Sequence, residues 1–249
     1  MSTPSRLSVN VNAVAFLRNR RDLPWPSVTH LASRALAAGA KGITVHPRPD
    51  ERHIRRSDVD DLTALIRDQF PGKELCLEGY PAAEFMDLLV RSRPDQVLFV
   101  PDDPAQSTSD HGWRFDADTA HLAEAVAAAH DLQIAVSLFC DPDPSAPAHA
   151  ARLGADRIEI YTGPYGGAYD DDDRAAAELD RVVATAEAAR AAGLGVNAGH
   201  DLTIANIPAL IARAPYIREM SIGHAFTADA LEHGFEASVR RFRGAMGEL

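Results

Sequence analysis

Cysteine is scarce in this chain, and the two that it has, Cys76 and Cys140, each lie within a short apolar run. So few thiols exclude a disulfide framework and predict a protein kept reduced. The N-terminal residues lack the apolar region of a secretory signal, and no stretch is long enough in apolar residues to cross a bilayer. We therefore expect a cytoplasmic protein that does not bind a membrane.

A basic excess is also missing, because 36 acidic side chains outnumber 25 lysines and arginines and give a formal net charge of -11. Nucleic acids and anionic membranes select proteins with a basic face, so neither is expected as a partner. An anionic small molecule is compatible with this charge if a few arginines converge on it.

Two ligand-binding signatures are absent from the sequence. The first expected strand runs into Asn10-Val11-Asn12 rather than into the glycine-rich fingerprint of a dinucleotide-binding fold. No His-x-His or His-Glu-x-x-His spacing occurs, which argues against a zinc site.

What the sequence does have is a regular alternation of short β-rich runs with alanine-rich helical segments. At 249 residues and 46% hydrophobic content, the chain is long enough to bury one large core. The expected strands are Leu7 to Asn12, Gly42 to His46, Glu74 to Glu78, Gln96 to Val100, Ala135 to Phe139, Arg157 to Ile160, Gly195 to Ala198 and Glu219 to Ile222. The expected helices are Val28 to Ala38, Ser57 to Gln69, Ala82 to Arg91, Ala117 to His130, Pro144 to Leu153, Asp172 to Ala192, Ile204 to Ala212 and Ala228 to Met246.

Eight strands that alternate with eight helices predict a TIM (β/α)8 barrel formed as a single domain by residues 1–249. Glycines after the helices that precede the second, sixth and seventh strands, at 39, 154 and 193, are typical of helix C-caps. A doubly wound open sheet is the rival architecture, but its phosphate-binding fingerprint is missing.

Polar residues gather at the carboxyl ends of the expected strands, where TIM barrels place their active sites. The second strand opens into His46-Pro47-Arg48, and both prolines at 47 and 49 prevent its continuation. An imidazole there can move protons near neutral pH, and a guanidinium can bind a phosphate or carboxylate. The other residues expected at this end are Asn10, Asn12, Glu78, Glu159, His200, Gly223 and His224.

Individual residues leave alternatives open. Glu78 interrupts an apolar run and is either a buried base or the partner of an arginine, with the base favoured. Glu159 either points into the barrel, where a carboxylate needs a cationic or hydrogen-bonding partner, or is paired outside it. Arg18, Arg20 and Arg21 either bind a phosphate or are solvated, and residues 101–112 form either a lid or a passive loop.

Across nearly its whole length the chain resembles the pyridoxine 5'-phosphate synthase family. The resemblance is carried by Val9-Asn10-Val11-Asn12, Leu17-Arg18-Asn19, Gly42-Ile43-Thr44-Val45-His46-Pro47-Arg48, Arg52-His53-Ile54, Glu78-Gly79-Tyr80-Pro81, Val100-Pro101-Asp102, Val136-Ser137-Leu138-Phe139, Glu159-Ile160-Tyr161-Thr162-Gly163, Val196-Asn197-Ala198-Gly199-His200 and Ser221-Ile222-Gly223-His224-Ala225. It implies condensation of 1-deoxy-D-xylulose 5-phosphate with 3-amino-2-oxopropyl phosphate, without metal or organic cofactor, by a homo-oligomer, an octamer in this family.

The resemblance also implies residue roles. His46 and Glu78 match proton acceptors, His200 matches a proton donor, and Glu159 matches a carboxylate that stabilises a transition state. Arg48, His53 and Thr108 match residues that hold the deoxyxylulose phosphate. Asn10, Arg21, Asp201, Gly223 and His224 match those that hold the amino ketone phosphate.

Many family members have Asp-His where this chain has Asn12-Ala13, and Gly where it has Asp201. Asn12 can hydrogen-bond a substrate hydroxyl but cannot take a proton. The altered end of the first strand motivates one alternative, a divergent paralogue that joins other phosphorylated carbonyl compounds. A non-catalytic barrel that binds a phosphorylated metabolite is a second alternative, and the intact His46, Glu78 and His200 argue against it.

Overall fold

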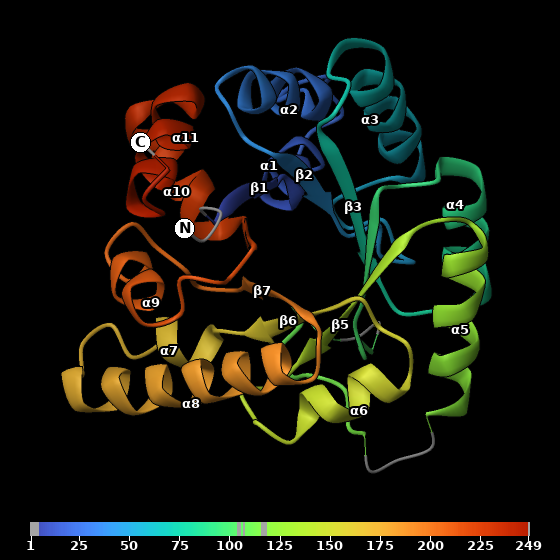
Figure 1. The fold of residues 1–249 in the computed structure, drawn as a ribbon. Helices are drawn as coiled ribbons and strands as arrows, with labels where there is room; N and C mark the ends of the chain where they lie inside the picture. Colours follow the sequence, from blue (N-terminus) through green and yellow to red (C-terminus); the bar gives the residue numbers. More distant parts are fainter. Residues whose placement is uncertain (1–4, 104–105, 107, 116–118, 249) are drawn as a thin grey trace.

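Eight parallel strands close into a barrel in chain order in the computed structural model, which describes residues 5–103, 106, 108–115 and 119–248 (Figure 1). Each strand pairs with the next, and β8 pairs with β1. The strands are β1 Arg6–Asn10, β2 Gly42–Val45, β3 Glu74–Gly79, β4 Gln96–Phe99, β5 Ala135–Cys140, β6 Arg157–Tyr161, β7 Gly195–Gly199 and β8 Glu219–Ile222. The predicted TIM barrel is thus confirmed.

The helices surround the barrel (Figure 1), and they lie between consecutive strands except for α10 and α11, which follow β8. They are α1 Asn12–Arg18, α2 Val28–Ala37, α3 Arg56–Gln69, α4 Ala83–Ser92, α5 Ala120–Asp131, α6 Ala146–Arg152, α7 Gly163–Gly166, α8 Asp172–Ala191, α9 Ile207–Arg213, α10 His224–His233 and α11 Phe235–Ala245. Most agree with the expected segments to within a few residues at their ends. The expected helix Ala117 to His130 corresponds to α5, and its expected first residue, Ala117, lies outside the described residues.

Three expectations about these elements were wrong. The first strand ends at Asn10, and Asn12 begins the short helix α1, whose Val14 and Ala15 are buried. The four-residue helix α7 was not expected. The last helix is two helices, because Gly234 adopts a positive φ of 85°, which interrupts the helix between α10 and α11.

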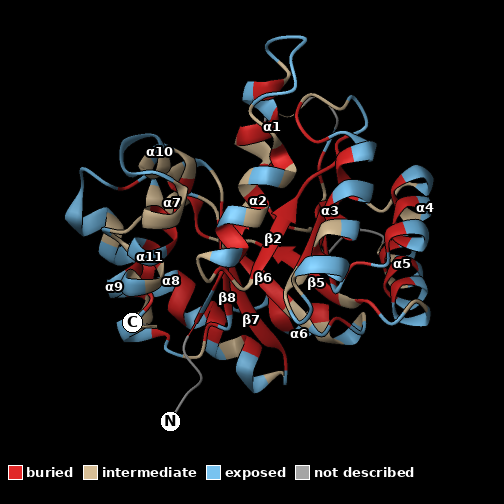
Figure 2. Ribbon diagram, turned by 90° about the horizontal axis from the view of Figure 1, so that it is seen from above, coloured by how far each residue is buried: buried red, intermediate tan, exposed pale blue. Residues whose placement is uncertain are grey.

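Side chains on the two faces of the strands differ in kind. Outward residues such as Leu7, Ile43 and Leu77 are fully buried against the helices, and Figure 2 shows burial concentrated in the strands. Since successive residues point to opposite faces, the inward positions form layers, and many of them are polar. Below the carboxyl ends, Ser8 and Thr44 share a hydrogen bond of 2.7 Å.

A second set of polar side chains lies deeper in the barrel. Gln96 Nε2 donates to Glu219 Oε1 at 3.3 Å, and Arg157 Nη1 donates to Gln96 Oε1 at 2.6 Å. Burial, with the nearby charge of Glu74, raises the pKa of Glu219 to about 7. These side chains therefore form a hydrogen-bonded polar layer inside the barrel, below the polar residues at the carboxyl ends of the strands.

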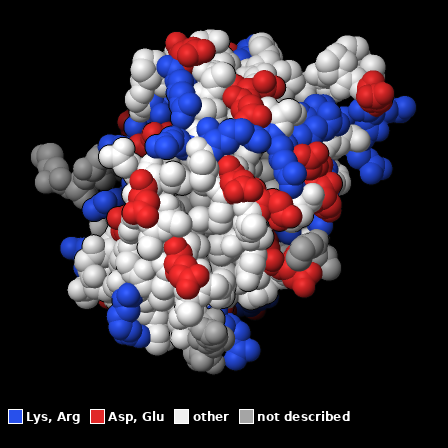
Figure 3. Space-filling model, turned by 90° about the vertical axis from the view of Figure 1, so that its right-hand side faces the viewer, with Lys and Arg blue, Asp and Glu red and all other residues white. Residues whose placement is uncertain are grey.

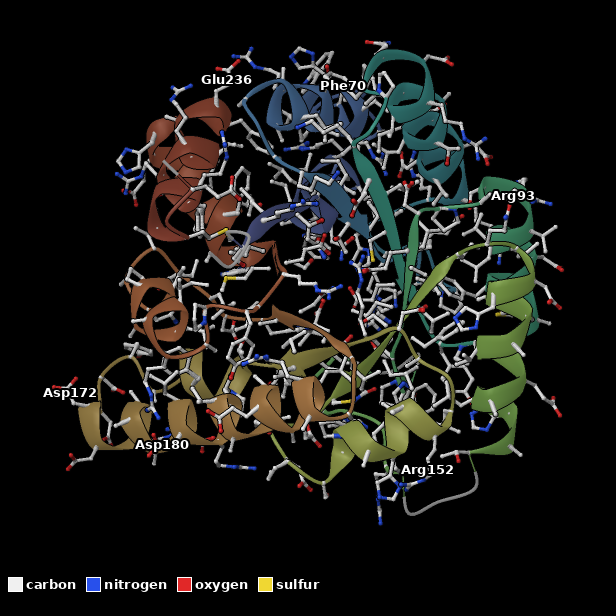
Figure 4. The ribbon with its side chains drawn as sticks, viewed as in Figure 1. Phe70, Arg93, Arg152, Asp172, Asp180 and Glu236 are labelled. Atoms are coloured by element: carbon white, nitrogen blue, oxygen red, sulfur yellow. The ribbon has the colours of Figure 1, made fainter. Side chains whose placement is uncertain are left out.

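The outer surface carries mixed charge. Acidic and basic side chains are interspersed on the face shown in Figure 3. Charged residues such as Arg93, Arg152, Asp172 and Asp180 extend from the helices away from the barrel (Figure 4). No helix among the described residues is long and apolar enough to span a bilayer.

Candidate active site

A cavity of about 560 Å³ opens at the carboxyl ends of the strands. It brings together every residue predicted for the site except Arg21. The predicted residues that line it are Asn10, Asn12, His46, Arg48, His53, Glu78, Thr108, Glu159, His200, Asp201, Gly223 and His224. They come from many separate strand ends, so closure of the barrel assembles them.

His46 and Glu78 form a buried pair at the ends of β2 and β3, with 3.3 Å between His46 Nδ1 and Glu78 Oε1. Ser109 Oγ donates to the same carboxylate oxygen at 2.9 Å. Burial alone would raise the pKa of Glu78, but His46, His200 and the Ser109 hydroxyl outweigh it and hold this pKa at about 2. Glu78 is therefore an anion whose partner is a histidine rather than an arginine.

Asn12 holds His46 in place. Its Oδ1 accepts a hydrogen bond from the His46 backbone N–H at 2.9 Å, and its own backbone N–H donates to Asn10 Oδ1 at 2.9 Å. The start of α1 is thus tied to the end of β2. An amide performs this task without charge, so the asparagine at position 12 fits the geometry around His46.

His200 follows β7 with a φ of 76°, in the left-handed region that non-glycine residues rarely adopt. Thr162 Oγ1 lies 2.5 Å from the Gly199 carbonyl oxygen and 2.7 Å from that of His200, so its one proton can be donated to either, which fixes this backbone. The ring lies 5.0 Å from that of Phe139 and 5.4 Å from that of Tyr161, centroid to centroid. Burial lowers the pKa of His200, so its imidazole is neutral at pH 7.

Glu159 points from β6 into the barrel and is 3% exposed. No hydrogen bond or ion pair of its carboxyl group is found among the described residues. Burial, together with the negative charges of Glu78 and Glu219, raises its pKa well above the usual value. Burial beside two carboxylates therefore favours the protonated form of Glu159. A neutral carboxyl group can donate a proton at pH 7.

Arg48 and Asp102 form a second buried pair, with 2.5 Å between Arg48 Nη2 and Asp102 Oδ2. His53 lies nearby, and burial, with the charges of His46 and Arg48, lowers its pKa to about 4. The neutral His53 imidazole accepts a hydrogen bond at Nδ1 from the Ile54 N–H. This corner of the cavity therefore has one fixed cation beside an uncharged ring.

The three arginines after β1 differ in their surroundings. Arg18 is buried in an ion pair with Asp58, and its Nη2 donates to the His53 carbonyl at 3.1 Å. It supports the loop that carries His53, and its charge is already neutralised. Arg20 and Arg21 are exposed and lie outside the lining of the cavity.

Helix α10 begins at the cavity. Gly223 is its N-cap, and Gly223, His224 and Ala225 all line the cavity. The first N–H groups of a helix have no partner within it and carry partial positive charge, which suits an anion. A Cβ at Gly223 would lie 3.1 Å from Asn10 Cβ, so the close approach of these two segments favours glycine.

Asp102, Ser109 and Tyr161 are site residues for which no role was predicted. Asp102 follows an apolar strand after one proline, and His46 directly follows another apolar strand, so the strand-end rule alone could have indicated Asp102. Ser109 belongs to the predicted lid, residues 101–112, of which 104–105 and 107 lie outside the described residues. Ser109 is buried against the barrel, and nothing in its local sequence signals this.

The fold and the cavity define a TIM-barrel protein with an acid–base site at the carboxyl ends of its strands. The sequence profile of the pyridoxal phosphate biosynthesis protein PdxJ family matches residues 7–248. The chain belongs to this family, which confirms the resemblance found in the sequence.

Proteins named pyridoxine 5'-phosphate synthase are close relatives. The one from Allorhizobium ampelinum is 58% identical over 248 residues, covering 99% of both chains. The one from Brucella anthropi is 57% identical over 243 residues, covering 98% of this chain and 99% of its own.

Solved structures share the fold at low identity. A tryptophan synthase alpha-subunit from Pyrococcus furiosus gives a TM-score of 0.65 at 14% identity, covering 100% of this chain and 99% of its own. A chain from Aquifex aeolicus gives 0.66 at 15% identity, covering 99% of this chain and 93% of its own.

Proposed function

We propose that this chain is a pyridoxine 5'-phosphate synthase, which joins 1-deoxy-D-xylulose 5-phosphate to 3-amino-2-oxopropyl phosphate and releases inorganic phosphate and water. Family membership supports the reaction. The single structural observation that carries it is the buried His46–Glu78 pair beside His200 in one cavity, since ring closure requires repeated proton transfers.

The protonation states divide the work. Glu78 is ionised and can accept a proton, with His46 beside it as a second acceptor. Glu159 is protonated and can donate to a developing alkoxide or leaving water. His200, neutral and fixed over the cavity, can donate a hydrogen bond through its remaining N–H, or accept a proton from the substrate and return it in a later step.

The cavity offers two places for phosphate groups. Arg48 provides a charge-assisted contact, and His53 adds an uncharged ring next to it. On the other side the N-terminus of α10 offers backbone N–H groups next to Asn10. We assign the first to the deoxyxylulose phosphate and the second to the amino ketone phosphate, with Thr108 and Asp201 at the rim.

The test is to incubate the purified protein with both substrates and to measure pyridoxine 5'-phosphate by mass spectrometry, with Glu78→Gln as the matched inactive control. Product from the wild type alone supports the proposal. If the folded wild type forms no product but consumes other phosphorylated carbonyl compounds, it is the divergent paralogue. If it only binds such compounds, it is the non-catalytic barrel.

We propose in addition that the protein is a cytoplasmic homo-oligomer, an octamer as in its family. Four large apolar side chains support an interface on the segment from α1 to α2: Phe16, Leu17, Leu23 and Trp25, which are 49%, 55%, 46% and 64% exposed. Light scattering of the purified protein measures the oligomer, and a monomeric mass would contradict it.

Arg21 lies in this same exposed segment and does not line the cavity of its own subunit. Its predicted phosphate contact is therefore proposed to be made in a neighbouring subunit. Mixing an Arg21→Ala variant with a Glu78→Gln variant tests this, because mixed oligomers would contain intact sites and regain activity. Two inactive variants that stay inactive after subunit exchange would contradict the shared site.

A further inference from the structure

Ser109 lies between two buried carboxylates. Its Oγ is 2.9 Å from Glu78 Oε1 and 2.8 Å from Asp102 Oδ2, and the residue is 1% exposed. A hydroxyl group has a single proton and can donate it to one acceptor at a time. The two carboxylates therefore compete for one hydrogen bond.

One of the two carboxylate oxygens of Asp102 lacks a hydrogen-bond donor among the described residues. Its Oδ1 is buried without a hydrogen-bond partner among the described residues, and its Oδ2 accepts from Arg48 Nη2 and faces the Ser109 hydroxyl. Arg48 also lines the cavity, so a bound phosphate would contact the same guanidinium. A bound anion would share the Arg48 guanidinium charge that stabilises the Asp102 carboxylate. Asp102 would then accept the hydrogen bond of the Ser109 hydroxyl more strongly.

Glu78 is sensitive to the loss of this donor. His46 Nδ1 lies 3.3 Å from the same Oε1, and the charge of His200 also lowers the pKa of Glu78. His53 and Glu159 face Glu78 as well, and its negative charge acts on both of them. A hydrogen bond donated to a carboxylate stabilises the charged form, so its removal makes the carboxylate a stronger base. Glu78 is held at a pKa of about 2, far below the range of an efficient base near neutral pH.

We propose, building on the function proposed above, that Ser109 is a positioning residue that turns its hydroxyl from Glu78 to Asp102 when a phosphate engages Arg48. Glu78 then becomes a better proton acceptor once the substrate is bound. The proton stays on Oγ throughout and only its acceptor changes, so no covalent bond forms or breaks. Binding at Arg48 is thereby coupled to proton abstraction at the end of β3.

The test is a titration of Glu78 by NMR on protein labelled with 13C in the glutamate carboxyl groups, with the signal assigned from its loss in Glu78→Gln. Inorganic phosphate is the probe at Arg48, and its binding is measured by calorimetry. In the wild type, saturating phosphate should raise the titration midpoint by roughly one pH unit. In Ser109→Ala the midpoint should start higher and rise less than half as much, and Ser109→Thr should restore the wild-type response.

Asp102→Asn provides a second variant with an opposite starting point. Without its competitor, the Ser109 proton remains on Glu78, so the midpoint should start lower and respond weakly to phosphate. An equal phosphate-induced rise in the wild type and Ser109→Ala would overturn the proposal, because simple charge repulsion would then account for it. Absence of phosphate binding, or its persistence in Arg48→Ala, would overturn it as well.

These measurements use no turnover, so they separate this inference from the proposed reaction. Coupling without formation of pyridoxine 5'-phosphate would support this inference and contradict the proposed reaction. Product formation without the coupling would support the proposed reaction and contradict this inference. In the active protein, Ser109→Ala should not lower kcat, because its Glu78 lacks the Ser109 donor before and after binding, and the KM for the deoxyxylulose phosphate should change little. A merely structural role would instead lower both kcat and thermal stability.

Discussion

The ends of β3 and β6 each present one glutamate to the same cavity, and the two differ in charge. Glu78 and Glu159 are buried to a similar degree, at 5% and 3% exposure. The pKa of Glu78 is lowered to about 2, whereas that of Glu159 is raised well above the usual value. Burial disfavours both anions equally, so neighbours decide the outcome.

The neighbours differ in a simple way. Glu78 faces two histidines and a hydroxyl donor, while Glu159 faces two carboxylates, Glu78 itself and Glu219. The ionised state of the first therefore helps to keep the second protonated. The proposed proton acceptor and the proposed proton donor are thus two residues of the same type in one cavity, a pattern known from acid–base enzymes.

The largest effect is expected from Glu78→Gln, which keeps the shape of the side chain and removes its proton acceptor. Turnover should fall by roughly 10²-fold or more with substrate binding largely kept. Steady-state kinetics with product detection measure this, and His200→Asn should behave similarly. If Glu78→Gln alters substrate binding and leaves turnover intact, Glu78 is a binding residue.

Arg48→Ala sharpens the comparison by separating binding from proton transfer. Loss of a charge-assisted contact made in the ground and transition states alike should raise the KM for the deoxyxylulose phosphate by about tenfold or more. Because Asp102 would then be buried without its cation, Arg48→Lys serves as the control for folding. An unchanged KM with reduced turnover would place Arg48 in the chemistry instead.

Glu159→Gln should change the pH dependence of stability in the opposite direction from Glu78→Gln. The folded chain keeps the Glu159 proton that the unfolded chain loses above about pH 4.3, so wild-type stability falls as pH rises toward the folded pKa. The glutamine variant lacks this loss, and its melting temperature relative to the wild type should rise by about 3 °C between pH 5 and 8.

Glu78→Gln is the matched control for this thermal measurement. Because the folded pKa of Glu78 is lowered, its contribution to stability is present above about pH 4.3 and is lost as pH falls through about 2. This variant should therefore melt below the wild type at pH 7. Equal pH dependence in both variants would show that the two carboxylates do not differ in charge.

The smallest effect is expected from chelation. Among the described residues, no group of three or more His, Cys, Asp or Glu side chains is arranged to hold a metal ion. A metal would add a positive charge that would erase the difference between the two glutamates. Activity should stay unchanged after exhaustive treatment with chelator, and activity that returns only with a divalent ion would refute a metal-free reaction.

Strand-end residues were the part of the site that the sequence could predict. The alternation of strands and helices sets the barrel, and the period of two along each strand brings His46, Glu78 and Glu159 to one end. Their protonation was beyond prediction, because the pKa of Glu159 depends on carboxylates contributed by β3 and β8.

Other features depend on contacts that no local pattern records. The apolar residues after Asn10 fit either a longer strand or a short helix, and packing of Val14 and Ala15 selects α1. Arg18 and Arg21 are near neighbours in sequence, yet one is buried by Asp58 and the other is exposed. The burial of Ser109 between two carboxylates likewise arises only when the segment after β4 packs on the barrel.

The break at Gly234 leaves α10 a separate helix whose first turn meets the cavity at Gly223. A phosphate bound by the backbone N–H groups of this turn makes contacts that do not depend on any side chain. Alanine scanning, which truncates side chains one at a time, would therefore leave such a contact undetected. Only a change in main-chain shape would reveal it, such as Gly223→Ala, whose new Cβ would press on Asn10.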